Sequence, residues 1–168
     1  YCGDIQTPVH SLSVEAKAWR ALYDIAPVLE AAGEAELGAK ARQGADRLRP
    51  RLMVAVARSI RHETSPPFVP IALLDNESVH DPITRTRIGS YWNLIINYVI
   101  GSRLFPPGSD EEAWIPKYLE THGGLFMGMT RAGGYEHGFW NGRDRLNPLY
   151  GTRYVLDLCE RMRGLFRL

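Results

Sequence analysis

Residues 13–61 read SVEAKAWRALYDIAPVLEAAGEAELGAKARQGADRLRPRLMVAVARSIR, and they contain the clearest helical pattern in the chain. Its apolar residues recur every three or four positions, which is the period of an α-helix. Ser13 suits a helix N-cap and Gly33 a helix C-cap, so we expect one helix over residues 13–32 and a second over residues 34–61. The short turn between them predicts an antiparallel helical hairpin.

Each of these helices carries apolar residues at helical spacing, the pattern of a face that packs into a core. In the first helix the apolar stripe consists of Val14, Ala18, Leu22, Ile25 and Leu29. In the second helix it consists of Leu37, Ala41, Leu48, Leu52 and Val56, opposite the basic residues Lys40, Arg47, Arg51 and Arg58. Pro27 and Pro50 interrupt the two patterns and predict a bend or a break in each helix.

The rest of the chain alternates long loops with helical patterns. Residues 64–88 are rich in proline and predict a loop, with a short strand or extended segment over 68–74. A mostly apolar helix is expected over 90–103, and the S-x-x-E sequence from Ser109 to Glu112 predicts a capping box that begins a helix ending near Thr121. A glycine-rich, aromatic loop follows over 123–146, and a last helix is expected over 147–163. The sequence therefore predicts an all-α protein.

Composition limits the classes of function. The 168 residues predict a single soluble helical domain with a real core over 1–168, and the net charge of +1 gives no field to attract nucleic acid or an anionic membrane. No apolar run has membrane-spanning length, and the five histidines and two cysteines do not have metal-ligand spacing. We therefore expect no nucleic-acid partner, no membrane partner, no metal and no cofactor.

Four segments resemble one family, the six-hairpin glycosidases. Residues 10–24, HSLSVEAKAWRALYD, are similar to the entry to an inner helix of that fold, and residues 89–98, GSYWNLIINY, to its Tyr-Trp-rich helix start beside the sugar cleft. Residues 134–141, GYEHGFWN, leading to LYGTRY over 149–154, resemble the loop before its last inner helix. The resemblance implies an α/α toroid of helical hairpins. With about five helices expected, this chain supplies roughly half of one and is expected to be a fragment.

The resemblance also implies a catalytic site. Glycoside hydrolysis canonically uses two carboxyl groups that flank the scissile bond. The resemblance makes Glu136 the general base, and Asp4 is the best partner acid, with Asp75, Glu77 and Asp81 as rival carboxylates on the middle loop. Flat aromatic rings cover the apolar faces of sugars, and amide, guanidinium and imidazole groups bind polar ones. The expected substrate-binding residues are Tyr91, Trp92, Asn93, Arg131, His137, Trp140 and Asn141.

Two functional hypotheses follow. The first is a glycoside hydrolase, or part of one, that acts on a carbohydrate through paired carboxylates. The alternative is a non-catalytic helical module that binds glycan or protein through exposed aromatic loops. An incomplete toroid leaves apolar helix faces uncovered, so we also expect either self-association or a partner that supplies the remaining toroid segment.

Overall fold

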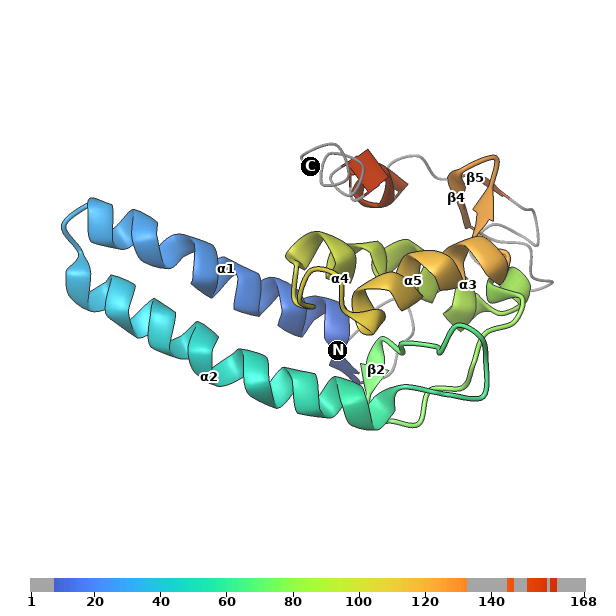
Figure 1. Cartoon of the computed structure of the whole chain (residues 1–168), viewed down its shortest axis with the longest axis horizontal. Helices are drawn as coiled ribbons and strands as arrows, with labels where there is room; N and C mark the ends of the chain where they lie inside the picture. Colours follow the sequence, from blue (N-terminus) through green and yellow to red (C-terminus); the bar gives the residue numbers. More distant parts are fainter. Residues whose placement is uncertain (1–7, 133–144, 147–150, 157, 160–168) are drawn as a thin grey trace.

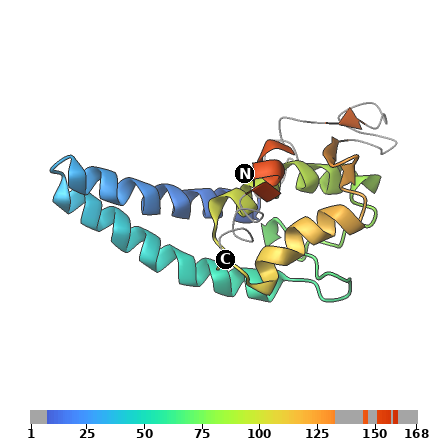
Figure 2. The same ribbon diagram turned by 45° about the horizontal axis from the view of Figure 1, so that its top comes forward.

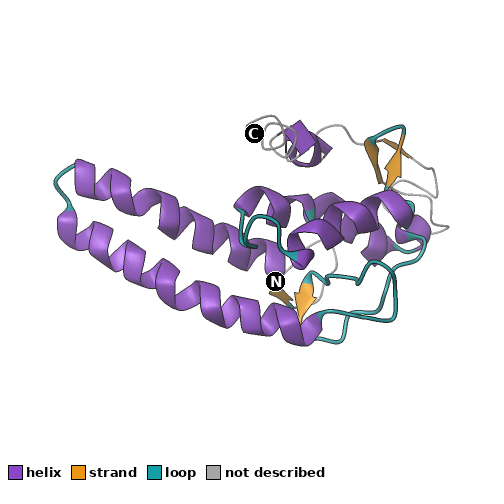
Figure 3. Ribbon diagram, viewed as in Figure 1, coloured by secondary structure: helices purple, strands orange, loops and turns teal. Residues whose placement is uncertain are grey.

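The computed structural model describes residues 8–132, 145–146, 151–156 and 158–159. The protein is mainly helical, as the sequence predicts, and it has two parts (Figure 1, Figure 3). One part is a long helical hairpin, and the other is a body of shorter helices and small antiparallel sheets. The hairpin projects from the body in both views (Figure 1, Figure 2).

The hairpin consists of α1 (Leu12–Ala31) and α2 (Ala35–Ser59), which confirms both predicted helices and their antiparallel packing. The predicted N-cap of α1 is wrong, because Ser11 occupies that position and Ser13 lies inside the helix. Gly33 has a φ of +88° in the turn between them, a conformation that a residue with a Cβ rarely adopts. Both helices continue through their prolines, Pro27 and Pro50, so of the predicted bend or break the break is wrong. Both prolines are exposed, so water can bind the carbonyl groups that proline leaves without a helical donor.

The predicted core face of α1 is largely wrong. Val14, Ala18 and Ile25 are exposed, whereas Leu22 and Leu29 are half-buried. The face that packs against α2 and the body instead carries the buried residues Leu12, Ala16, Trp19 and Ala26. Helix α1 has two apolar faces of the same period, and the tertiary partner determines which of them is buried. The predicted face of α2 is closer, because Ala41, Leu52 and Val56 are buried and only Leu37 is exposed.

The loop after α2 returns the chain to the base of the hairpin. Strand β1 (His10–Ser11) pairs antiparallel with β2 (Ala72–Leu73), and a single bridge joins Arg61 to Phe68. The ring of Phe68 lies 5.3 Å from that of Trp92 and 5.2 Å from that of Tyr118, measured between centroids. This aromatic cluster is the centre of the core, and it ties the loop to the two helices that carry Trp92 and Tyr118.

The body contains a 3-10 helix, η1 (Ile83–Arg85), followed by α3 (Arg87–Ile95), α4 (Asn97–Ser102) and α5 (Asp110–Thr121). The single predicted helix over 90–103 is thus divided at Ile96. The predicted cap of α5 is confirmed: Ser109 Oγ accepts a hydrogen bond from the Glu112 amide at 3.3 Å.

A small sheet and a further helical segment complete the body. The sheet has the order β3 (Leu125–Phe126), β4 (Met129–Ala132) and β5 (Arg145–Leu146), a structure that the sequence patterns did not predict. Residues 151–156 and 158–159 are helical, which agrees with the last predicted helix where the structure describes it.

Candidate functional site

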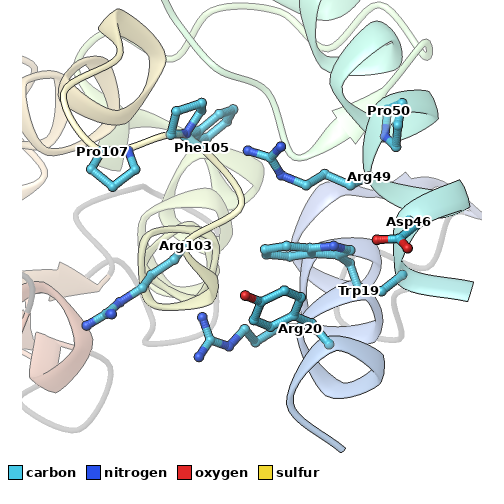
Figure 4. Close-up of a pocket in the computed structure, with 11 residues that line it drawn as sticks. Trp19, Arg20, Asp46, Arg49, Pro50, Arg103, Phe105 and Pro107 are labelled. Carbon is cyan, nitrogen blue, oxygen red and sulfur yellow. The ribbon is translucent and has the colours of Figure 1, made fainter. Parts of the chain in front are cut away.

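A pocket of about 490 Å³ lies where the hairpin joins the body. Its volume is in the range of small-molecule sites. Three segments line it: α1, α2 and the connection from α4 to α5 (Figure 4). The lining residues are Trp19, Arg20, Tyr23, Ala45, Asp46, Arg49, Pro50, Arg103, Phe105, Pro106 and Pro107. We call this site the arginine–aromatic pocket.

Arg49 is fixed in the pocket by two kinds of contact. Its Nε and Nη2 atoms donate hydrogen bonds to the Leu104 carbonyl oxygen at 3.1 and 2.9 Å. Its guanidinium carbon lies 5.6 Å from the centroid of the Trp19 ring, a cation–π distance. Two N–H donors of the Arg49 guanidinium therefore hold α2 against the α4–α5 connection. This contact fixes the Arg49 side chain in the lining of the pocket.

Helix α1 adds Arg20 and two aromatic rings to the lining of the pocket. Trp19 and Tyr23 lie 5.7 Å apart between ring centroids, and Arg20 Nε donates a hydrogen bond to Asp24 at 2.7 Å. In Figure 4 the Trp19 indole lies between the side chains of Arg49 and Arg20. Trp19 is buried, but Tyr23 is 52% exposed. Tyr23 thus offers an aromatic surface to a ligand at the pocket mouth.

Arg103 brings a third cation to the pocket from the body. It is the C-cap of α4, with a φ of +56°. The next two residues, Leu104 and Phe105, are buried and anchor the connection to the core. The pocket lining contains three arginines (Arg20, Arg49 and Arg103) and one acidic residue, Asp46. The formal charge of the lining is therefore +2, in a chain whose net charge is +1. The arrangement suits recognition of an anionic group, since arginine binds carboxylates and phosphates in a bidentate manner.

A second, smaller pocket of about 360 Å³ contains two of the rival carboxylates from the middle loop, Asp75 and Glu77. Glu77 Oε2 accepts hydrogen bonds from the amides of Ile71 and Ala72, both at 2.8 Å, and Glu77 Oε1 lies 2.8 Å from His80 Nε2. Both side chains of the Glu77–His80 pair are buried. The Glu77 carboxylate therefore organises the loop around β2.

Four of the predicted substrate-binding residues lie in the described part of the chain. Tyr91 and Arg131 are half-buried, whereas Trp92 and Asn93 have no exposed surface. Trp92 Nε1 donates a hydrogen bond to the Val69 carbonyl at 2.9 Å, so the indole is enclosed and offers no face to a sugar. Asn93 Nδ2 donates to the Arg131 carbonyl at 2.6 Å, which ties α3 to β4. The structure thus brings Asn93 and Arg131 together, away from the arginine–aromatic pocket.

The other predicted site residues lie outside the described residues. They are the two catalytic candidates, Glu136 and Asp4, and the substrate-binding candidates His137, Trp140 and Asn141. Their roles remain predictions.

The arginine–aromatic pocket was not predicted from the sequence. The local signal is present in residues 19–23, where Trp19 and Tyr23 stand four positions apart beside Arg20, but this pattern also fits an ordinary helix surface. The residues that complete the pocket are distant in sequence, and only the tertiary structure brings them together.

Within the described residues, histidine, cysteine and acidic side chains do not gather in groups of three or more that could hold a metal ion. A search of the same residues finds no helix with the length and hydropathy to cross a membrane. Comparison of the chain with protein-family models, with curated proteins and with solved structures finds no match.

Proposed function

We propose that this protein is a helical binding module whose arginine–aromatic pocket holds a carbohydrate that carries a carboxylate group. The observation that carries the proposal is the placement of three arginines beside the exposed ring of Tyr23 in one pocket of about 490 Å³. This ligand class extends the glycan-binding hypothesis drawn from the sequence.

The chemistry of an acidic sugar matches the two halves of the pocket. A pyranose ring has an apolar C–H face, which packs well on a flat aromatic surface such as that of Tyr23. Its carboxylate suits the guanidinium groups of Arg20 and Arg103, since charge-assisted hydrogen bonds are about twice as strong as neutral ones. Asp46 supplies an acceptor for sugar hydroxyl groups. A neutral sugar gains only the stacking and hydroxyl contacts, so we expect the pocket to prefer the acidic one.

The test is a calorimetric titration with an oligogalacturonate and with a neutral galactose oligomer of the same length. We expect the acidic oligomer to bind at least about tenfold more tightly, which corresponds to about 1.4 kcal/mol. Arg103→Gln should remove most of that preference. Arg47→Gln is the matched control, because Arg47 is exposed on α2 and does not line the pocket. Equal binding of the two oligomers, no binding of either, or an unaffected Arg103→Gln variant would refute the proposal.

The hydrolase is the second candidate, and the α/α toroid belongs with it. Two observations favour it: the resemblance of four segments to six-hairpin glycosidases, and the α1–α2 hairpin, which is the kind of unit that such a toroid repeats. In this proposal Glu136 is the base and Asp4 the acid, and the remaining toroid segment comes from a partner. The hydrolase would be supported if the parent protein releases reducing sugar from an oligosaccharide. The Glu136→Gln variant should then lose this activity but still bind the sugar. Absence of turnover by the parent protein would leave the binding module alone.

A further inference from the structure

The outer face of α1 carries an apolar stripe that is exposed in the described part of the chain. It consists of Val14, Ala18, Ala21, Ile25 and Val28 of the helix and Ala32 at its C-cap, all of them exposed. Val14 and Val28 are each 59% exposed and Ile25 is 42% exposed. At about 100° per residue the six positions fall within a sector of about 80°, on a different side of the helix from the residues that contact α2. We call this surface the outer stripe.

The spacing of the outer stripe is that of a coiled-coil seam. Successive residues are separated by four, three, four, three and four positions, which is an uninterrupted heptad pattern over residues 14–32. A surface helix needs only one apolar face to pack onto its own domain, and α1 already uses Leu12, Ala16, Trp19 and Ala26 for that purpose. A second apolar face with heptad spacing is typical of a helix that pairs with another helix.

We propose that the outer stripe pairs with the outer stripe of a second copy of this chain, in an antiparallel arrangement about a two-fold axis at the level of Tyr23. The argument is size complementarity. In this register Val14 faces Ala32 of the second copy, Ala18 faces its Val28, and Ala21 faces its Ile25. Every layer thus joins one alanine to one β-branched residue, so the layers have similar volumes and can be filled evenly.

The parallel arrangement does not have this property. In parallel register each residue of the stripe faces its own copy, so two layers of paired alanines in the middle would be followed by a layer of paired isoleucines at position 25. The large layers hold the helices apart and leave the alanine layers underfilled, which costs packing energy. The stripe is therefore complementary to itself only when the two helices are antiparallel.

The charges beside the stripe agree with the same axis. Arg20 and Asp24 form an ion pair at 2.7 Å on one flank of the stripe. Each Asp24 is already paired with the Arg20 of its own copy, so the axis does not bring unpaired like charges together.

The contact is one helix from each copy and is about 28 Å long, from 19 residues at 1.5 Å each. That is smaller than a standard interface, so we expect a weak dimer with a dissociation constant in the micromolar range. The occupant that we propose is a second copy and not a membrane, because the stripe is narrow and complementary to itself.

The first test is sedimentation equilibrium at about 1 to 200 µM, a range that spans micromolar dissociation constants. The expected result is a mass that rises from 18.9 kDa toward twice that value. Ile25→Glu should raise the dissociation constant at least about tenfold, since it places a charge in two layers. Val54→Glu is the matched control, because Val54 is also an exposed aliphatic residue but lies on α2. A monomer at every concentration, or equal effects of the two variants, would overturn the proposal.

The second test distinguishes the two directions. In a background with Cys2 and Cys159 replaced by serine, Ala21→Cys protein is mixed with Ile25→Cys protein under mild oxidation. The antiparallel dimer predicts a disulfide between the two variants and little cross-linking of Ala21→Cys with itself. The reverse outcome, in which Ala21→Cys cross-links to itself and not to Ile25→Cys, would show a parallel pair and would overturn the proposed arrangement.

Discussion

Replacing Glu77 by alanine is expected to destabilise the fold strongly, although the residue was a candidate for catalysis by sequence. The Glu77 side chain is buried, and its carboxylate holds three groups in place at once. It accepts hydrogen bonds from the backbone amides of Ile71 and Ala72 and pairs with the imidazole of His80. These contacts fix the loop that carries β2 onto the core.

The magnitude follows from the two backbone hydrogen bonds. A hydrogen bond to a charged group contributes about 1.5–3 kcal/mol, and a buried donor left without a partner costs a similar amount. Glu77→Ala removes the acceptor of two amides, and it leaves His80 without its partner. We therefore expect the free energy of unfolding to fall by about 3–5 kcal/mol. Glu77→Gln keeps an acceptor for the amides and should lose only about 1–2 kcal/mol.

The assay is urea-induced unfolding at neutral pH, followed by circular dichroism. The urea concentration at the midpoint should fall, while the slope of the unfolding free energy against urea concentration stays constant. This combination reports a change in stability alone. Glu36→Ala is the control, because the Glu36 side chain is 84% exposed and its ion pair with Lys40 lies on the surface. We expect that control to change stability by less than about 0.5 kcal/mol. A Glu77→Ala protein as stable as the control would refute the structural role that we assign to Glu77.

Two further predictions concern Tyr118 and the glycines. Burial, with a smaller contribution from Asp81, raises the pKa of Tyr118 above its ordinary value, so the folded state holds the phenol proton more tightly than the unfolded chain does. The stability that depends on this proton is present below about pH 10 and is lost above it. Between about pH 8 and 11, the urea midpoint of unfolding should therefore fall less in the Tyr118→Phe variant than in the parent protein. A Cβ on Gly89 would overlap the Ile83 carbonyl oxygen, so Gly89→Ala should lose more than about 3 kcal/mol in thermal unfolding. Gly44→Ala, where a Cβ meets only the tip of Leu22 at 3.2 Å, should cost little or gain up to about 1 kcal/mol in helix propensity. A smaller loss for Gly89→Ala than for Gly44→Ala would contradict this account.

The hairpin and the cap of α5 could be predicted from sequence because both depend on local physics. Periodicity, Gly33 in the turn, and the Ser109–Glu112 spacing act over a few residues, and the structure confirms all three. Whether each proline would bend its helix or break it could not be decided from the sequence. Whether a proline ends a helix depends on whether its orphaned carbonyl reaches water, and this depends on the face that the tertiary structure buries.

The candidate site could not be predicted because it is assembled from distant segments. Trp19, Asp46 and Phe105 line the same pocket, but they belong to three segments of which the last follows the first by more than eighty residues. Each of them alone has an ordinary explanation as a core aromatic or a solvated acid. The same limit applies to Trp92, whose position in an aromatic helix start suggested a sugar platform but whose ring is enclosed by Phe68 and Tyr118.

The two surfaces of α1 should act independently. Tyr23 at the pocket mouth and Ile25 in the outer stripe are two residues apart, which places them about 200° apart around the helix. A second copy seated on the outer stripe therefore leaves the arginine–aromatic pocket open. We expect Ile25→Glu to weaken self-association while its affinity for the oligogalacturonate stays within about twofold of the parent value, as measured by calorimetry at a concentration where the parent dimerises. A loss of sugar binding in Ile25→Glu, with Val54→Glu unaffected, would show instead that the pocket is completed across the dimer, and the two surfaces would then have to be treated as one site.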